Sequence, residues 1–319
     1  MTPTPHDALF RAIFSQPCYA AEELRTVVPR EVLAELDLAA LRPREGSFID
    51  EGLRASSADL LFSVGLKRGG TGFVYVLFEH QSTLDPRMPW RLLQYQARIW
   101  ERHLAEQPNE STLPPILALM LHQGPRPWPA PPRFVTMLAV HERLRAALER
   151  RHLDFEFLLD DLATQTDAQI LGRASDAVVR LTLLALRNGR AHPRLFEHVA
   201  GVMQELENEL RGPAVVSALA RLARYVLEVG DASPAVIRSA FAAALSPRIR
   251  SSVMSTADML RAEGHLEARR ESLLDQLEIK FGPVDAPTRS RIEHATNEQL
   301  VAWLRRVVVA SALAAVFAD

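Results

Sequence analysis

Three polar residues of the sequence, Asp59, Glu79 and Gln81, lie in otherwise apolar segments and could together bind a divalent cation. Successive side chains of a β-strand point to opposite faces, so Glu79 and Gln81 would share one face. If residues 58–81 form a hairpin centred on Gly69, paired residue numbers sum to 138, and Asp59 lies opposite Glu79. Opposed side chains have Cβ atoms about 5 Å apart. Two carboxylates at that distance repel each other, and a cation such as Mg²⁺ would remove the repulsion.

Phosphodiester hydrolysis is the chemistry that such a site predicts. Mg²⁺ or Mn²⁺ held by carboxylates polarises a scissile phosphate and lowers the pKa of a bound water. Gln81 could orient that water, although an amide does not titrate and so cannot act as an acid or a base. The simpler alternative is that Asp59 begins a strand as a turn residue and Glu79 ends one near solvent. The three residues together, in apolar strands around one turn, favour the metal site.

Candidate contacts to a DNA phosphate lie outside the hairpin. Arg91 and Tyr95 are four residues apart on a predicted helix and could both reach a phosphate, although a solvated helix face explains their spacing equally well. Asp7 could reach the same cleft, but capping of the first helix is a sufficient reason for an aspartate there. We expect His80 to pack or to form a hydrogen bond on the opposite face of the sheet.

The elements that position these residues follow from hydrophobic periodicity. Residues 4–7 predict the start of a helix, with Thr4 as the cap, and a second helix should run through residues 20–28. Residues 58–66 and 72–81 predict a hairpin that is covered on both faces, because nearly every residue in them is apolar. A helix should follow over residues 90–104, with Leu93, Ala97, Trp100 and Leu104 on its buried stripe. Residues 115–121 and 154–159 predict two further strands, with room for one more helix between them.

The second half of the chain has helical periodicity almost throughout, from Asp167 onward. We therefore predict a nuclease-like core over residues 1–163 and a helical region over residues 164–319 that serves support, assembly or regulation. A long charged helix over residues 251–281 and the terminal helices over residues 300–317 carry apolar stripes. These stripes could pack on a second copy of the chain or within the monomer.

Composition sets limits on location and partners. The 319 residues are 48% hydrophobic and 24% charged, with a net charge of −2, which gives no global nucleic-acid signal but leaves a local basic groove open. Cys18 is the only cysteine, so a disulfide or a cysteine-based zinc site is not expected. The N-terminal segment does not resemble a signal peptide, and the apolar run over residues 307–317 is shorter than the roughly 20 residues that span a bilayer. We expect a cytoplasmic protein without a membrane span.

The strings SADLLFSV, YVLFEHQST, MPWRLLQY and LPPILALMLHQG, the last followed by PW, resemble the Rpn family of recombination-promoting nucleases. That family is also described as transposases and belongs to the PD-(D/E)XK superfamily. HDALFRAIF near the start and EGHLEARRESLLDQLEIKFG and LVAWLRRVVVASALAAVF near the end are similar to the family's ends, so the resemblance covers most of the chain. It implies a restriction-endonuclease-like α/β core with a mixed sheet, Mg²⁺-dependent cleavage of DNA, and a role in recombination or mobile DNA.

The resemblance also implies roles for individual residues. Asp59 corresponds to the aspartate of the superfamily motif, and Glu79 to the acid of its E-x-K element. Gln81 stands where most of the superfamily has lysine; glutamine is typical of this family, which leaves open which group activates the water. Asp7 is similar to an acid that some members contribute from the first helix.

Two other functions stay open on the sequence. A catalytically weak DNA-binding or regulatory relative would keep Asp59 and Glu79 without cleaving, and metal-dependent nicking of plasmid DNA would separate it from an endonuclease. A true transposase would need a third carboxylate on a later strand, for which Asp154 or Asp160 could be proposed.

Overall fold

A computed structural model describes residues 4–44, 60–67, 73–129, 133–148, 151–189, 195–206, 213–229, 234–245 and 247–317. The chain divides into two compact units, Met1–Ser251 and Ser252–Asp319. The first unit contains a five-stranded mixed sheet with helices, and the second is built from helices. The predicted α/β core with a mixed sheet is therefore confirmed, while the predicted boundary near residue 163 stays a prediction.

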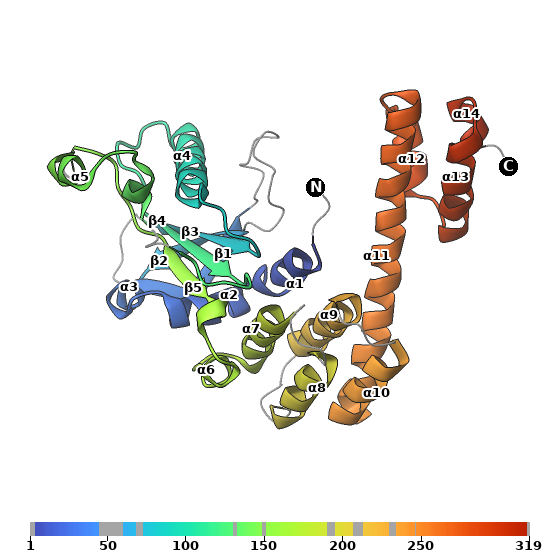
Figure 1. The fold of residues 1–319 in the computed structure, drawn as a ribbon, viewed down its shortest axis with the longest axis horizontal. Coiled ribbons are helices and arrows are strands. Elements are labelled where there is room, and N and C mark those ends of the chain that lie inside the picture. Colours follow the sequence, from blue (N-terminus) through green and yellow to red (C-terminus); the bar gives the residue numbers. More distant parts are fainter. Residues whose placement is uncertain are drawn as a thin grey trace. The chain divides into compact units, whose positions relative to one another are not determined.

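The sheet of the first unit has the strand order β1-β2-β3-β4-β5 (Figure 1). Its strands are β1 (Leu36–Arg44), β2 (Leu60–Leu66), β3 (Phe73–Gln81), β4 (Ile116–His122) and β5 (Leu158–Asp161). The β1–β2 and β2–β3 pairs are antiparallel, whereas the β3–β4 and β4–β5 pairs are parallel. A parallel pair needs a crossover connection, and α4 (Met88–Glu106) supplies it between β3 and β4.

The register of the β2–β3 hairpin agrees with the sequence analysis. The described pairs run from Leu60 with Phe78 to Gly65 with Phe73, and every pair has residue numbers that sum to 138. The predicted hairpin and its register are thus confirmed for these pairs. Residues 68–72, which contain the predicted turn, lie outside the described residues.

Helices cover both faces of the sheet, as the apolar strands predicted. Residues 60–64 of β2 are all buried, which requires cover on each side. One face packs on α4 through a cluster that includes Leu61 and Met120. The other side carries α1 (Pro5–Phe14), α2 (Pro17–Val27) and α3 (Arg30–Glu35), and α2 contacts both β1 and β5 (Figure 1).

The first helix begins where the sequence predicted. Thr4 is the N-cap of α1, Pro5 occupies the first turn, and Thr4 and Asp7 form a reciprocal capping box. The second helix begins at Pro17, three residues earlier than expected, because a proline at the first helical position suits a helix start.

The buried stripe of α4 differs from the prediction. Met88, Leu92, Tyr95 and Ile99 pack against the sheet, whereas Ala97 is exposed and Leu104 is 41% exposed. The predicted residues and the buried residues both have helical spacing, so this helix contains two neighbouring apolar stripes. Trp100 lies at the edge of the buried face, where its indole nitrogen donates to the carbonyl of Pro114 at 2.8 Å.

Two strands were missed or misplaced. The sequence analysis did not predict the helix α3 or the strand β1. Because β1 is an edge strand that contains Pro43 and has an irregular register between Asp37 and Arg42, its alternation of apolar and polar residues is weak. The strand expected over residues 154–159 begins only at Leu158. The segment before it is a loop, because the Asp154 carboxylate accepts from the amide of Val135 at 2.9 Å.

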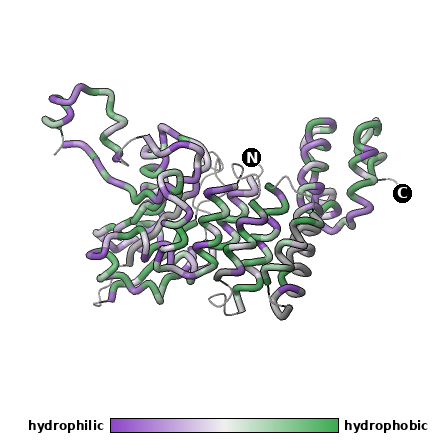
Figure 2. The backbone as a smooth tube through the Cα atoms, turned by 60° about the horizontal axis from the view of Figure 1, so that its bottom comes forward, coloured by the Kyte–Doolittle hydropathy of each residue, from purple (hydrophilic) through white to green (hydrophobic). Residues whose placement is uncertain are grey.

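Helices make up most of the described residues from Asp167 onward, as predicted. Between β4 and β5 lie a 3₁₀ turn (Phe134–Met137) and α5 (Glu142–Leu148), and a second 3₁₀ turn follows β5 (Leu162–Thr164). The later helices of the first unit are α6 (Asp167–Leu171), α7 (Ala177–Asn188), α8 (Leu195–Glu205), α9 (Pro213–Val229) and α10 (Pro234–Ala244). Hydrophobic and hydrophilic residues alternate along these helices, as expected when one face is buried (Figure 2).

The second unit has its own core. The long helix α11 (Pro247–Phe281) begins in the first unit and contributes its later turns to the second, together with α12 (Ala286–Glu293), α13 (Asn297–Val309) and α14 (Leu313–Val316). Leu273, Trp303 and Phe317 lie in the buried cluster of this unit. Gly282 ends α11 with a φ of 84°, a conformation that glycine adopts without strain. No helix in the described part of the chain combines the length and the apolar content that crossing a bilayer would require.

Candidate functional site

The carboxyl ends of three parallel strands form the edge of the sheet where the predicted site residues belong. Gln81 at the end of β3 pairs with His122 at the end of β4, and His122 pairs with Asp161 at the end of β5. In open α/β sheets, ligands bind in the crevice outside the carboxyl ends of such strands. This edge is therefore the place to examine for chemistry.

The structure locates part of the predicted metal site. Asp59 lies outside the described residues, and the structure describes the backbone of Glu79, which pairs with Met120 of β4. Gln81 is 9% exposed, and its carbonyl accepts from the amide of Gln123 at 2.9 Å. The juxtaposition of Asp59 with Glu79 stays a prediction. Among the described residues, three or more potential metal-ligating side chains do not gather at any point.

The two predicted phosphate contacts on α4 have different environments. The Arg91 guanidinium lies 3.3 Å from the Asp85 carboxylate and 5.9 Å from the centre of the Tyr95 ring, and its side chain is 17% exposed. Tyr95 is buried in the cluster between α4 and the sheet, so it does not lie on the solvated helix face that its spacing also allowed. The structure thus brings Arg91 and Tyr95 together, and their contact with phosphate stays a prediction.

Asp7 of α1 binds His80 of β3. The Asp7 carboxylate lies 2.9 Å from the Nδ1 atom of His80, whose ring stacks on Phe10 at 5.1 Å between centroids. Burial opposes ionisation of Asp7, but hydrogen bonds from His80 and Thr4 outweigh it and lower the pKa of Asp7 from 3.8 to about 2. The expectation that His80 packs and forms a hydrogen bond is confirmed.

A short loop follows β4 at the same edge, and the sequence analysis did not predict its contacts with the strand ends. The ring of His122 is fully buried, its Nε2 atom lies 3.0 Å from the carbonyl of Arg126, and its ring meets the edge of Trp128. The amide of Trp128 donates to the Asp161 carboxylate at 2.7 Å. The Gly and Pro residues of this segment are typical of a loop, but only the structure shows that the segment lies against the ends of β4 and β5.

A buried charged cluster on the other side of β5 was also missed. Arg173 donates to both oxygens of Asp160 at 2.7 and 2.9 Å and to Glu23 at 3.3 Å. Burial and the neighbouring Asp160 raise the pKa of Glu23 well above its ordinary value. Burial opposes ionisation of Asp160, but hydrogen bonds from Glu23 and Arg173 outweigh it and lower its pKa. The cluster is balanced within itself, which is typical of a structural network.

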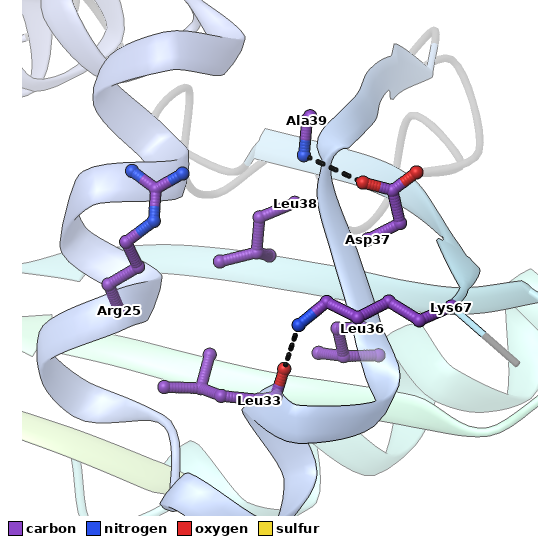
Figure 3. A pocket seen from close by; sticks show the side chains of 7 residues that line it. All are labelled: Arg25, Leu33, Leu36, Asp37, Leu38, Ala39 and Lys67. Carbon is purple, nitrogen blue, oxygen red and sulfur yellow. Dashed lines mark hydrogen bonds between the residues drawn. The ribbon is translucent and has the colours of Figure 1, made fainter.

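A pocket of about 330 Å³ lies at the opposite end of the β2–β3 hairpin (Figure 3). Leu36 and Leu38 line it, and the ammonium group of Lys67 donates to the carbonyl of Leu33 at 3.1 Å across it. Lys67 follows the end of β2, whereas the predicted metal site lies at the start of that strand. The pocket is therefore separate from the site at the carboxyl ends.

The comparisons with known proteins agree on one family. A family model described as "Putative transposase, YhgA-like" matches residues 4–213. Recombination-promoting nuclease RpnA of Escherichia coli strain K12 is 30% identical over 262 residues, 82% of this chain and 85% of that protein. Recombination-promoting nuclease RpnD of Escherichia coli O157:H7 is 29% identical over 233 residues, 72% of this chain and 84% of that protein.

One of the similar proteins is named as inactive. The inactive recombination-promoting nuclease-like protein RpnE of Escherichia coli strain K12 is 28% identical over 277 residues, 86% of this chain and 87% of that protein. No solved structure matches the chain. The family model and the relatives that span most of its length agree, and the chain belongs to the YhgA-like family that includes the recombination-promoting nucleases.

Proposed function

We propose that this chain is a metal-dependent DNA endonuclease with a restriction-endonuclease-like core, acting in recombination or on mobile DNA. The observation that carries the proposal is the register of the β2–β3 hairpin. Its described pairs follow the sum of 138 up to Leu60 with Phe78. One further pair in the same register would join Asp59 to Glu79. The names of the relatives support the same function.

In this proposal Asp59 and Glu79 hold Mg²⁺ or Mn²⁺, and Gln81 orients the attacking water. These residues fit such an ion, because hard divalent cations take oxygen ligands, and two carboxylates with an amide oxygen offer them. A bound ion would polarise the scissile phosphate and lower the pKa of the water. Gln81 lies at the end of β3 beside the end of β4, which is followed in the sheet by the end of β5. The partner would be DNA, bound at the carboxyl edge of the sheet.

A catalytically weak relative that binds DNA is the second candidate. The observation that favours it is the inactive relative, which is similar to this chain over 86% of its length. A true transposase with three carboxylates has less support. Both carboxylates considered as its third member are engaged, Asp154 with Arg133 and Asp160 with Arg173.

Plasmid nicking in Mg²⁺, in Mn²⁺ and in chelator tests the proposal. Asp59→Ala and Glu79→Ala should each lower the rate about a hundredfold or more, because removing a ligand of a catalytic metal costs roughly 3 kcal/mol of barrier. Glu101→Ala is the matched control, since Glu101 is an exposed carboxylate on α4, and it should cleave like the wild type. A wild-type chain that leaves the plasmid intact in both metals would favour the inactive relative. Unchanged cleavage by Asp59→Ala or Glu79→Ala would remove that residue from the site.

A further inference from the structure

The loop that joins β4 to the rest of the chain is held to all three parallel strand ends. The amide of Gln123 donates to the carbonyl of Gln81 at 2.9 Å, and His122 Nε2 lies 3.0 Å from the carbonyl of Arg126. The amide of Trp128 donates to Asp161 at 2.7 Å. These bonds fix the beginning, the middle and the end of the loop on β3, β4 and β5.

One cationic side chain is presented by this fixed loop. Arg126 is exposed, and within the described residues its guanidinium has neither an ion pair nor a hydrogen bond. Arg91, by contrast, is paired with Asp85. Pro125 and Pro127 flank Arg126 and restrict the backbone, so little backbone entropy remains to be lost when Arg126 binds a ligand.

His122 is the residue that sets the position of Arg126. Because a carbonyl only accepts, the Nε2 atom of His122 must donate to Arg126. The Nδ1 atom, which is an acceptor in a neutral ring with this tautomer, is buried without a hydrogen-bond partner among the described residues. Burying an unsatisfied acceptor costs stability. The hydrogen bond from Nε2 to the Arg126 carbonyl is therefore the reason we see for a histidine at this position.

The close approach of the loop to the strand end depends on Gly124. A Cβ atom at this position would lie 2.5 Å from Cε1 of His122 and 3.3 Å from the carbonyl of Ser82. Any larger residue would displace the histidine ring or the backbone beside Gln81. The loop is therefore built to lie directly against the proposed catalytic edge.

We propose that Arg126 binds a phosphate of the DNA backbone beside the scissile bond, and that His122 and Gly124 position it. The proposal rests on the proposed function, because it needs DNA at the carboxyl edge of the sheet. Arginine is the residue best suited to this task, since its planar guanidinium can donate two parallel hydrogen bonds to phosphate oxygens. A phosphate contact positions the duplex without reading its sequence.

Binding of a fluorescent duplex oligonucleotide in chelator, where the proposed cleavage cannot proceed, tests the assignment. Arg126→Ala should bind about tenfold more weakly at low salt. Between about 50 and 200 mM salt, its plot of log affinity against log salt should lose a slope of about 0.9, the value for one phosphate contact. Arg126→Lys should keep the slope because it keeps the charge. Arg98→Ala, an exposed arginine of α4 that pairs with Glu101, is the matched control.

The outcomes separate this inference from the proposed function. If Arg126→Ala binds with the affinity and slope of the wild type, the phosphate contact is wrong, and the plasmid results for Asp59 and Glu79 still stand. A wild-type chain that binds no duplex would overturn both.

The positioning role has its own test. Gly124→Ala should weaken binding when Arg126 is present and change it little in an Arg126→Ala background, because both changes act on the same contact. Equal losses in the two backgrounds would overturn the role of Gly124 and His122 as positioning residues.

Discussion

In our proposal Gln81 stands where the resemblance to PD-(D/E)XK nucleases implies a lysine. Its amide cannot titrate, so in our proposal it acts by hydrogen bonding to the water rather than by taking its proton. The described contacts of its backbone hold it at the junction of β3 with the loop after β4. A substitution at this position therefore tests polarity separately from charge.

We predict that Gln81→Leu lowers metal-dependent cleavage and that Gln81→Lys keeps or raises it. In the proposed site, leucine would leave the attacking water without a polar neighbour, whereas lysine would restore the group that the resemblance to PD-(D/E)XK nucleases implies. The measurement is the nicking rate at saturating Mg²⁺, with circular dichroism to check folding, because Gln81 is buried. Cleavage by Gln81→Leu at the wild-type rate would make Gln81 a structural residue.

The sequence could predict site residues that lie close together along a hairpin, but not those that tertiary packing brings together. Glu23 and Arg173 are 150 residues apart, and no local pattern indicated that they share a buried cluster. The hydrogen bond from His122 to the carbonyl of Arg126 depends on the shape of a loop, which the sequence pattern does not give. Contacts of this kind follow from the completed sheet rather than from periodicity.

Among the elements, α1 connects the sheet to the helical part of the first unit. Its Asp7 binds His80 of β3, and its His6 lies 2.7 Å from the hydroxyl of Tyr225 in α9. The capping box fixed the start of this helix from sequence alone, but its two long-range partners could not be read from it. The helix thus stabilises the strand that contains Glu79 from the side away from α4.

The contact of Asp7 with His80 makes the free energy of unfolding depend on pH. The pKa of Asp7 is about 2 in the folded chain and 3.8 in the reference state, so its contribution to stability is present above pH 3.8 and is lost as the pH falls toward 2. Allowing for its partial exposure, Asp7→Asn should lower the free energy of unfolding by about 1–2 kcal/mol near neutral pH. Urea denaturation across pH should show this difference shrinking below about pH 4. A difference that stays constant with pH would contradict the ionised Asp7–His80 contact.

The elements of the fold were predicted to different degrees, for physical reasons. Long periodic helices and the central strands agree with prediction, because burial on one or both faces leaves a clear pattern. The edge strand β1 was missed because it is only partly buried, and the stripe of α4 was misplaced because two apolar stripes compete. Which stripe packs is decided by the sheet and not by the helix.

In the whole molecule, the sheet-containing unit and the helical unit have separate hydrophobic cores. The family model matches residues 4–213, all of them in the first unit. The proposed chemistry therefore belongs to that unit, and assembly through the later helices stays a prediction. Metal binding should stabilise the unit that contains β2 and β3, which makes unfolding a measure of the site without knowledge of the DNA substrate.

Thermal melts of the wild type and of Glu79→Gln, each in chelator and in millimolar Mg²⁺, test the paired carboxylates most directly. Without metal, Glu79→Gln should melt higher, because opposed like charges cost about 0.5 kcal/mol. Mg²⁺ should stabilise the wild type by about 1.4 kcal/mol at roughly ten times its dissociation constant, and the variant should lose most of that gain. Glu101→Gln, an exposed carboxylate of α4, should respond to Mg²⁺ like the wild type. If wild type and Glu79→Gln respond identically to Mg²⁺, Asp59 and Glu79 do not form the metal site.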